Sequence, residues 1–532
     1  MDKKSADDNH SSWNRRSFIK SLPAALGLPY ILTNTGEAKG RPQNSDQPLD
    51  EKPISAKKLL KKVPRPILPS RPDLIEMYDK CWVLGLKNSD LGTEENGFVD
   101  WFIDEGFDER IFQWDTCFAL AWAKYSQGGL PNIESLDNFY NAQNPDGAID
   151  GVIGAGGENT HSKDAINFTR NPLFAWSEYE YYQVTGDTSR IERVLPILTD
   201  YSRWVRKHRR RANGHFYWSG LSSGMDNSPR TKARAFYPPW GFVDYNANMA
   251  LSAWHMIRLA RLINDRETEE EFQKLHSELK TLINRDMWSE EDQFYWDIDR
   301  DGSFLKTKTV ASFWPLWGRV AEEKHVEGLV KHLNDPKSFN RPHRVPTTAA
   351  DEEAYHPEGY YWQGSVWAPT NHMIVKGLEA NGQHKLAREI VQNHINIQSI
   401  VYRDQKTVYE NYSPEYMRPG QPWSRSDFVG WSADGPIAQL IEHYIGIKLD
   451  VPNNKVRWDL LTIEEVGLEN LQLGDATLSL KASKREAPDD PVELTLKTDK
   501  AYTLELHTDY NTYLKRITPG THTLTFQNEN NS

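Results

Sequence analysis

The run MALSAW at residues 249–254, which Ile257 and Ala260 continue, repeats small and apolar side chains at helical spacing. A stripe of this kind predicts an α-helix with one buried face. Comparable patterns recur between residues 71 and 449 and predict about twelve helices, with long aromatic or glycine-rich loops after every second one. This spacing of loops indicates a closed double ring, with six helices inside six, and such a ring gathers the loops of one end over a central pocket.

The pattern changes after Lys455, where leucines alternate with polar residues. The alternating leucines include Leu471, Leu473, Leu478, Leu480, Leu494, Leu496, Leu504 and Leu506. A period of two is typical of β-strands, and spacers such as PDDP at residues 488–491 supply turns between them. We therefore expect a helical catalytic domain at residues 70–450 and a small antiparallel β-sandwich at residues 451–532. The sandwich contains no carboxylate cluster and is interpreted as a structural cap.

The N-terminus carries an export pattern. NRRSFIK at residues 14–20 contains a twin-arginine pair, and a modestly apolar run follows from Leu22 to Leu32. Because that run is too short to span a bilayer, residues 1–38 are interpreted as a cleavable twin-arginine signal, which implies a periplasmic or secreted product. A chance arginine pair on a disordered tail is the alternative. Residues 39–69, rich in proline, lysine and aspartate, are expected to form a linker or extended arm.

The bulk composition limits the class of ligand. The 532 residues carry a formal net charge of -12, so no general basic surface attracts nucleic acid. The 19 tryptophans and 23 tyrosines can pack in a core or stack on the apolar faces of sugars. We therefore expect a small carbohydrate substrate, no nucleic-acid partner and no membrane span. The oligomeric state has no visible signature in the sequence.

Neither a cofactor nor a metal site is expected. The two cysteines, Cys81 and Cys117, allow one disulfide bond or two buried free thiols, and they provide no metal-binding cluster. The histidines show no metal-ligand spacing. DIDRDG at residues 297–302 matches the start of a calcium loop, but Lys308 occupies the position of the closing glutamate, so a hairpin turn is predicted instead.

A loop without helical or strand periodicity, SGLSSGMDNSPR at residues 219–230, places one carboxylate among glycines and serines, with aromatic residues on both sides. A carboxyl group on such a turn can be partly desolvated, and desolvation favours the protonated form that a general acid needs. Asp226 is therefore either a turn cap or a catalytic acid. Arg230 either binds a substrate carboxylate or hydroxyl or orients a nearby acidic side chain.

Three further loops combine aromatic residues with acidic or amide ones. They place Trp114 and Asp115 in FQWD, Trp362, Gln363 and Gly364 in YYWQGSVW, and Glu410 and Glu415 in VYENYSPE, with Trp431 downstream. Singly, each loop is typical of a packed core and a helix cap. Together they favour a pocket with two carboxylates, the minimum for glycoside hydrolysis. Asp226 is the predicted acid and Glu410 the predicted base, with Glu415 as the other candidate for the base.

The motifs SGMDNSPR, WDT, YYWQGSVWAPTN and YENYSPE resemble family 63 of the glycoside hydrolases, and within it the mannosylglycerate hydrolase-like branch. They are similar, more distantly, to the family 37 trehalases. The resemblance covers residues 110–449 and implies an (α/α)6 barrel that hydrolyses α-linked sugars with inversion. It also implies that Asp226 is the general acid and Glu410 the general base.

The same resemblance implies a set of sugar-binding residues. Trp114 and Asp115 match the pair that holds the non-reducing sugar, and a carboxylate can accept hydrogen bonds from two neighbouring hydroxyls. Asn171 replaces the glutamine of a trehalase segment. The W-x-G segment of the family is matched by Trp362, Gln363 and Gly364, with Gln363 in place of the arginine that is common in family 63.

These patterns predict an exported inverting α-glycosidase that hydrolyses an α-linked glucoside or mannoside in a disaccharide, a glycosylglycerate or a short oligosaccharide. Inversion predicts about 6.5 to 9.5 Å between the two carboxyl groups. A polysaccharide lyase or sugar epimerase on the same ring is an alternative, with Tyr412 and His161 as acid and base candidates. A catalytically inactive sugar-binding protein is another, which the presence of both Asp226 and Glu410 disfavours.

Overall fold

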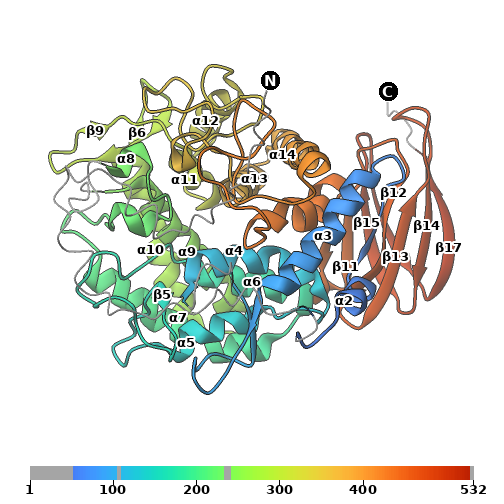
Figure 1. Ribbon diagram of the computed structural model, residues 1–532, viewed down its shortest axis with the longest axis horizontal. Helices are drawn as coiled ribbons and strands as arrows, with labels where there is room; N and C mark the ends of the chain where they lie inside the picture. Colours follow the sequence, from blue (N-terminus) through green and yellow to red (C-terminus); the bar gives the residue numbers. More distant parts are fainter. Residues whose placement is uncertain (1–48, 50–51, 105–109, 233–240, 528–532) are drawn as a thin grey trace, which may run out of the picture.

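Helices form most of the regular structure up to residue 445, and strands form the C-terminal part (Figure 1). The computed structural model describes residue 49 and residues 52–104, 110–232 and 241–527. The expected export signal at residues 1–38 lies outside the described residues. A helix-rich body followed by a β-sheet region is the organisation that the sequence predicts.

One set of helices in the described part of the chain is buried on most sides. In α4, for example, all 11 residues are buried. A helix that is apolar or small on all faces needs protein around it, so this set forms the interior of the helical domain. Its members are α4 (Gln113–Ala123), α6 (Phe174–Thr185), α9 (Val243–Leu262), α11 (Trp314–Trp317), α13 (Ala368–Ala380) and the π-helix η9 (Gly435–Ile445).

A second set of helices has one buried stripe and one polar face. α10 buries Phe272, Leu275 and Leu279 at spacings of three and four residues. The side chains of Asp187 and Asp265 cap the N-termini of α7 and α10. These helices alternate along the chain with the buried set. They are α3 (Pro72–Asn88), η4 (Ile133–Leu136) with α5 (Asp137–Asn141), α7 (Thr188–His208), α10 (Arg266–Asp286), α12 (Glu323–Asn334) and α14 (His384–Gln405).

The buried helices contact one another in chain order. α4 contacts α6, α6 contacts α9, α9 contacts α11, and α11 contacts α13. The short helix η8 (Ser432–Asp434), which leads into η9, contacts both α13 and α4. The series of buried helices therefore returns to its first member.

Shorter elements connect these helices. The short helices are α2 (Ala56–Lys62), η3 (Lys124–Ser126), η5 (Gly220–Ser223), α8 (Pro229–Lys232), η6 (Val310–Phe313), η7 (Tyr361–Gln363) and η10 (Val451–Asn453). The two-stranded ladders are β2 (Ser89–Leu91) with β3 (Trp101–Ile103), β4 (Ile111–Phe112) with β5 (Val152–Ile153), β6 (Trp288–Ser289) with β7 (Phe294–Tyr295), and β8 (Asp297–Ile298) with β9 (Phe304–Leu305). The last ladder confirms the hairpin predicted for the calcium-like stretch.

Two larger sheets form the C-terminal region. The five-stranded sheet has the order β1 (Arg65–Ile67), β12 (Val466–Leu473), β13 (Ala476–Ala482), β14 (Val492–Thr498) and β17 (Gly520–Phe526). The four-stranded sheet has the order β10 (Ile447–Asp450), β11 (Lys455–Asp459), β15 (Tyr502–His507) and β16 (Thr512–Ile517). The predicted period of two is confirmed: in β13, Leu478 and Leu480 are buried and the residues between the buried ones are half-buried.

One strand pair differs from the expected antiparallel arrangement. β11 and β15 run parallel, with Val456 opposite Leu504, whereas the other pairs of the two sheets are antiparallel. The chain leaves β11, forms β12 to β14 in the other sheet and then returns, so no hairpin links β11 to β15. The prediction of an antiparallel sandwich is wrong at this pair. β1, which lies within residues 39–69, adds to the edge of the five-stranded sheet beside β12.

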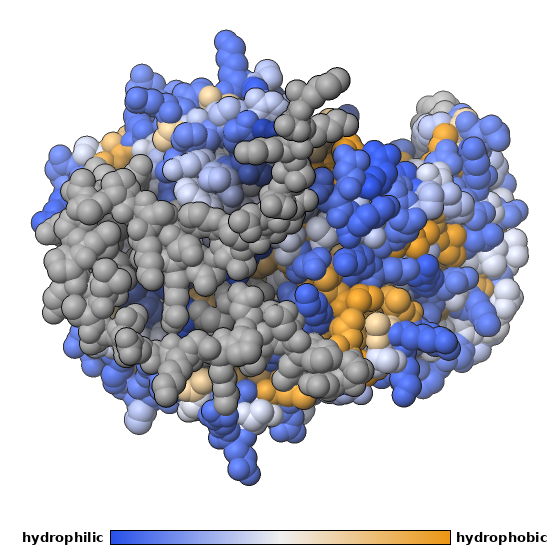
Figure 2. Space-filling model, in the orientation of Figure 1, coloured by the Kyte–Doolittle hydropathy of each residue, from blue (hydrophilic) through white to orange (hydrophobic). Residues whose placement is uncertain are grey.

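The described residues also settle the state of the two cysteines. Cys81 and Cys117 are buried free thiols, and burial raises the pKa of both. No described helix is both long and apolar enough to cross a bilayer. In the same residues, no group of three or more His, Cys, Asp or Glu side chains is arranged to hold a metal ion. On the face shown in Figure 2, hydrophilic side chains predominate outside the grey segments, and apolar ones form separate patches.

Candidate active site

Most of the predicted site residues lie at the N-terminal ends of the buried helices. Trp114 and Asp115 are in the first turn of α4, Asn171 precedes α6, and Trp431 precedes η8 and η9. The loop at residues 360–367 leads directly into α13. The first N–H groups of a helix have no partner within the helix and give this end a partial positive charge, which favours carboxylates and polar ligands.

Residues 219–230, called the acid loop below, pack against the start of α4. Asp226 lies half-buried in the turn between η5 and α8. Gly224 has a φ of +80°, and a Cβ at this position would come within 3.4 Å of the Trp114 indole. The left-handed backbone favours glycine here, while the distance to the indole is that of ordinary van der Waals contact.

Asn227, the residue after the predicted acid, joins the acid loop to the loop that leads into α13. Its side-chain amide donates to the Tyr360 carbonyl at 3.0 Å, and its side-chain oxygen accepts from the Trp362 amide at 2.8 Å. Its backbone carbonyl accepts a further bond, of 2.9 Å, from the Gln363 side chain. Because the asparagine amide both donates and accepts, it fixes the position of the peptide segment between its two partners.

The segment that Asn227 holds carries Tyr361, whose hydroxyl donates to the Glu410 carboxylate at 3.2 Å. Tyr360 and Tyr361 both have left-handed backbone, with φ of 44° and 64°. This conformation is unfavourable for residues with a Cβ, and such strain is concentrated at functional sites. The predicted acid and the predicted base are thus connected through Asn227 and Tyr361.

Glu410 is buried, and the hydrogen bonds to its carboxylate include two from neutral donors. One is the Tyr361 hydroxyl, and the other is the Arg425 backbone amide at 3.3 Å. The Glu410 backbone carbonyl accepts a hydrogen bond of 3.0 Å from the Trp431 indole. Hydrogen bonds to a carboxylate favour its ionised form, which is the form that a general base needs.

Glu415, the other candidate for the base, is held in an ion pair. Arg341 donates to both carboxylate oxygens, at 2.6 and 3.0 Å, and the Tyr355 hydroxyl donates at 2.5 Å. Burial opposes ionisation, but these donors outweigh it and lower the pKa of Glu415. A bidentate arginine holds a carboxylate in its ionised form, so Glu415 is poorly suited to take a proton from water.

Tryptophans from the predicted loops pack together at this end of the domain. Trp114 meets Trp362 and Trp431 edge to face, with ring centroids 6.2 and 5.9 Å apart. Trp362 stacks on Trp367 with a centroid distance of 3.8 Å and an interplanar angle of 4°. The exposed fraction is 3% for Trp114, 1% for Trp362 and 3% for Trp431. The structure therefore brings the three predicted tryptophans into one buried aromatic cluster.

Asn171 positions the acid loop. Its side-chain amide donates to the Ser223 carbonyl at 3.1 Å, and its side-chain oxygen accepts from the Asn248 side chain at 2.6 Å. The Gln113 side chain donates to its backbone carbonyl at 2.6 Å. Through these bonds Asn171 links the acid loop to the first residue of α4 and to the second turn of α9.

The remaining members of the predicted set are buried as well. Asp115 is 9% exposed in the first turn of α4, where the helix N-terminus favours its charge. Gln363 uses its side-chain amide to hold Asn227. Gly364 has a φ of +155°, and a Cβ there would lie 2.5 Å from the His356 carbonyl, so a larger residue would displace the loop.

Arg230 takes the second of its two predicted roles, the orientation of acidic side chains. Its guanidinium donates to Asp244 at 2.6 and 3.1 Å and to Asp297 at 2.9 and 2.8 Å. Burial raises the pKa of Asp244, although Arg230 opposes that effect. The bidentate bonds to both carboxylates tie the end of the acid loop to α9 and β8.

A second group of buried charges, called the charge cluster below, lies toward the C-terminal ends of the same helices. Lys124 follows α4, Glu180 is in α6, Lys376 in α13 and Glu442 in η9. Lys124 lies 2.7 Å from Glu180 and 2.8 Å from Glu442, and Lys376 lies 2.8 Å from Glu442. Burial opposes all four charges, but their mutual attraction outweighs it, which lowers the pKa of both glutamates and raises that of both lysines.

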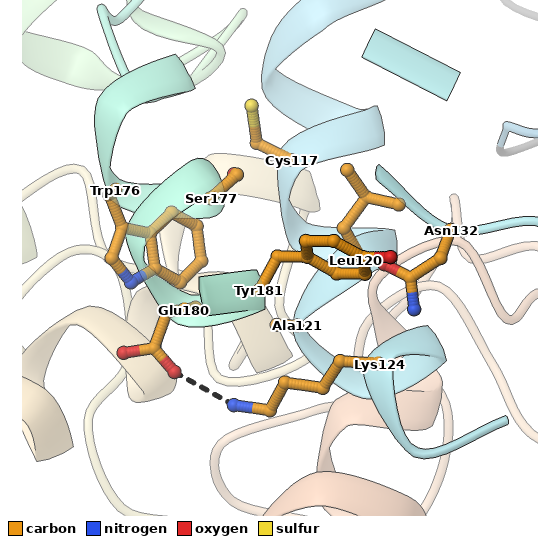
Figure 3. Close-up of a pocket in the computed structure, with 9 residues that line it drawn as sticks. All are labelled: Cys117, Leu120, Ala121, Lys124, Asn132, Trp176, Ser177, Glu180 and Tyr181. Atoms are coloured by element: carbon orange, nitrogen blue, oxygen red, sulfur yellow. Dashed lines mark hydrogen bonds and ion pairs between the residues drawn. The ribbon is translucent and has the colours of Figure 1, made fainter. Parts of the chain in front are cut away.

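A small pocket lies beside the charge cluster between α4 and α6 (Figure 3). Figure 3 shows Lys124 reaching toward Glu180 along one side of it. It is lined by Cys117, Leu120, Ala121, Lys124, Asn132, Trp176, Ser177, Glu180 and Tyr181. None of the predicted site residues lines this pocket, so it is a separate feature from the candidate active site.

Two functional candidates were not singled out by the sequence analysis. Asn227 stands next to Asp226 in the acid loop, and its only sequence signal is that position. Tyr361 follows another tyrosine in an aromatic run, and no local pattern indicates that its backbone is left-handed or that its hydroxyl meets Glu410. Asn227 contacts Tyr360 across 133 positions of the chain, and Tyr361 contacts Glu410 across 49 positions. Both contacts therefore depend on the tertiary fold.

The chain resembles known proteins both in sequence and in fold. The sequence of residues 109–432 matches the family model of the mannosylglycerate hydrolase MGH1-like glycoside hydrolase domain. An uncharacterised protein of Borreliella burgdorferi is 28% identical over 455 residues, 81% of this chain and 91% of its own. The mannosyl-oligosaccharide glucosidase of Saccharomyces cerevisiae is 24% identical over 278 residues, 47% of this chain and 32% of its own.

Two solved structures show the likeness in fold. The family 63 mannosylglycerate hydrolase of Thermus thermophilus, in complex with glucose, is 18% identical with a TM-score of 0.55, over 68% of this chain and 99% of that one. The neutral trehalase of Saccharomyces cerevisiae is 13% identical with a TM-score of 0.51, over 68% of this chain and 79% of that one. Together the matches confirm the resemblance to family 63 and the more distant one to trehalases.

Proposed function

Because the chain belongs to the mannosylglycerate hydrolase MGH1-like glycoside hydrolase family and is therefore a glycoside hydrolase, we propose that it inverts the anomeric centre of an α-linked glucoside or mannoside. Asp226 is the general acid and Glu410 the general base. The observation that supports this most is the chain of contacts from the acid loop to Glu410. Asn227 holds the segment that carries Tyr361, and Tyr361 donates to Glu410.

The closed series of buried helices is, in this proposal, the inner ring of an (α/α)6 barrel. The alternation of buried and amphipathic helices and the contacts in chain order support it. A barrel of this kind gathers the N-terminal loops over one pocket, where the predicted site residues lie. The two C-terminal sheets pack as a sandwich in the same proposal, because their buried faces, with Leu480 and Leu504, belong to one apolar cluster.

The proposed reaction is a single displacement. Asp226 gives its proton to the glycosidic oxygen while the bond from the anomeric carbon to that oxygen breaks. Glu410 takes a proton from a water molecule, and the hydroxyl that forms attacks the anomeric carbon from the opposite face. The Tyr361 hydroxyl and the Arg425 amide hold the base carboxylate in place, while Trp114 and Asp115 bind the sugar that carries the reacting carbon.

The proposed substrates are disaccharides, glycosylglycerates and short oligosaccharides. The Thermus thermophilus enzyme was crystallised with glucose, and also with Tris and D-glycerate. Gln363 replaces the arginine that is common in family 63, and its side chain holds the backbone carbonyl of Asn227. Export through the twin-arginine signal at residues 1–38 belongs to the same proposal and suits glycosides scavenged outside the cytoplasm.

The positions of Tyr412 and His161 do not favour a lyase or epimerase. Tyr412 is buried, its hydroxyl accepts a hydrogen bond of 3.1 Å from the Tyr409 amide, and burial raises the pKa of that hydroxyl. His161 pairs with Asp150 at 3.0 Å in the loop after β5. A tyrosine in the interior cannot exchange protons readily with a substrate, so we keep hydrolysis as the proposal.

Replacement of the acid tests this proposal. Asp226→Asn keeps the shape of the side chain but cannot give up a proton, so hydrolysis of an α-glycoside should fall by about 10²- to 10⁴-fold. The activity is measured on a panel of α-linked disaccharides and glycosylglycerates, and circular dichroism serves as the control for folding. Unchanged turnover by a folded Asp226→Asn variant would remove Asp226 from the mechanism.

A further inference from the structure

Aromatic side chains form a half-exposed stack beside the candidate active site. The rings of His356 and Tyr360 are stacked with centroids 4.6 Å apart and an interplanar angle of 28°. Tyr360 also contacts Trp423, at 4.7 Å and 52°. His356 is exposed, whereas Tyr360 and Trp423 are half-buried. Large aromatic surface that remains in contact with water is a common feature of binding sites.

Backbone hydrogen bonds join the stack to the acid loop. The Tyr360 carbonyl accepts from the Asn227 side chain at 3.0 Å, next to the predicted acid. The Tyr360 amide in turn donates to the Gln421 carbonyl at 2.9 Å, two residues before Trp423. Trp423 is therefore tied, through Tyr360, to the loop that carries Asp226.

The stack is joined to the base as well. Asn411, which follows Glu410 in the chain, donates from its side chain to the Trp423 carbonyl at 3.0 Å. Two residues after Trp423, the Arg425 amide donates to the Glu410 carboxylate at 3.3 Å. Trp423 thus lies on a segment that contacts both carboxylate-bearing loops.

The burial of the aromatic residues indicates which sugar each group would meet. Trp114, Trp362 and Trp431 are at most 3% exposed at the starts of the buried helices. If the enzyme removes the sugar at the non-reducing end of its substrate, that terminal sugar enters the closed end of the pocket first. The leaving group then points toward solvent, where the half-exposed rings of Tyr360 and Trp423 lie.

We propose that Trp423, supported by Tyr360, forms a subsite for a sugar ring on the leaving-group side of the bond that is cut. This inference rests on the proposed function and narrows its substrate class. The apolar face of a pyranose ring covers an indole well, whereas the short carboxylate-bearing chain of glycerate does not. The preferred substrates are therefore α-linked disaccharides and oligosaccharides rather than glycosylglycerates.

Substrates with and without a ring in the leaving group test the inference. Trp423→Ala should lower kcat/KM for an α-linked disaccharide by about 10- to 100-fold, as expected for truncation of an aromatic anchor. The same variant should hydrolyse the matching α-glycosyl fluoride within about twofold of wild type, because fluoride makes no ring contact. Trp423→Phe should restore most of the disaccharide activity. Tyr510→Ala, at an exposed aromatic in the β-sheet region, serves as the matched control.

Three results would overturn the inference while leaving the proposed hydrolysis intact. These are equal losses on the disaccharide and the fluoride, no loss on the disaccharide, or wild-type protein that prefers a glycosylglycerate to every disaccharide. A wild-type protein that hydrolyses neither the fluoride nor any glycoside of the panel would instead overturn the proposed function itself.

Discussion

The charge cluster and the predicted base both contain buried carboxylates, but different groups donate to them. In the charge cluster, lysine ammonium groups lie 2.7 Å from Glu180 and 2.8 Å from Glu442. At the N-terminal ends, the Glu410 carboxylate accepts hydrogen bonds from a tyrosine hydroxyl and a backbone amide. The charge cluster thus holds its carboxylates with lysines of the buried helices, whereas Glu410 lies on the loop before η8 and is joined to the acid loop through Tyr361 and Asn227.

The difference separates a structural role from a chemical one. A carboxylate paired with a buried ammonium can be protonated only by leaving that ammonium uncompensated, which is costly. The Tyr361 hydroxyl and the Arg425 amide instead hold the Glu410 carboxylate on the loop that is joined to the acid loop, where the proposed base is needed. The C-terminal ends thus contribute to stability, and the N-terminal ends provide the proposed base.

The largest expected effect is at Glu410. In Glu410→Gln the side chain keeps its size and shape beside Tyr361 and Arg425, but it cannot accept a proton. The value of kcat should therefore fall by about 10²- to 10⁴-fold. Glu415→Gln, in which the lost carboxylate is the one bound by Arg341, is the matched control. Its turnover per folded molecule should stay within a few-fold of wild type. Equal losses in the two variants would remove the distinction between the two glutamates.

The next effect concerns stability and leaves chemistry unchanged. Lys376→Met removes one ammonium from the charge cluster and leaves buried negative charge uncompensated, which should cost about 3–5 kcal/mol in the free energy of unfolding. Turnover per folded molecule should not change. Lys324→Met is the control. The side chains of Lys324 and Glu290 are both exposed, so their ion pair should contribute nothing measurable to the urea midpoint. A Lys376→Met variant as stable as wild type would show that the cluster is not a stabilising device.

A smaller effect should appear in the acid range. Burial opposes the ionisation of Glu180 and Glu442, but Lys124 and Lys376 outweigh it and lower the pKa of both carboxyls below the ordinary value of 4.5. The resulting stability is fully present above about pH 4.5 and is lost as the pH falls through the lowered values. At pH values below about 4.5, the urea concentration at the unfolding midpoint should therefore decrease as the pH falls. The decrease should be less steep in Lys376→Met than in wild type. Parallel curves for the two proteins would contradict this origin of the acid sensitivity.

The regions that the sequence predicts well are those with local periodicity. The stripe through Met249 and Ile257 lies in α9, and the alternating leucines lie in β12 to β15. The parallel pairing of β11 with β15 was not predictable in this way, because it depends on which sheet the chain returns to. The role of β1 as an edge strand was missed for the same reason, since Ile67 pairs with Gly467 at the far end of the chain.

The candidate site shows the same limit. Motif composition identified the loops that carry Asp226 and Glu410, but not the side chains that join them. Asn227 and Tyr361 act through contacts with residues 133 and 49 positions away. The role of Arg230 was left open because Asp244 and Asp297 have no visible link to it in the sequence. Long-range polar contacts are decided by the fold, and a local pattern does not contain them.

The configuration of the first product tests the central proposal most directly. A freshly mixed reaction on an α-linked glucoside or mannoside, followed by proton NMR, separates the two anomers of the released sugar before they equilibrate. If Asp226 and Glu410 act as acid and base around one water molecule, the β-anomer appears first and the α-anomer grows only by mutarotation. If the α-anomer appears first, the reaction proceeds with retention and the assignment of Glu410 as a base is wrong.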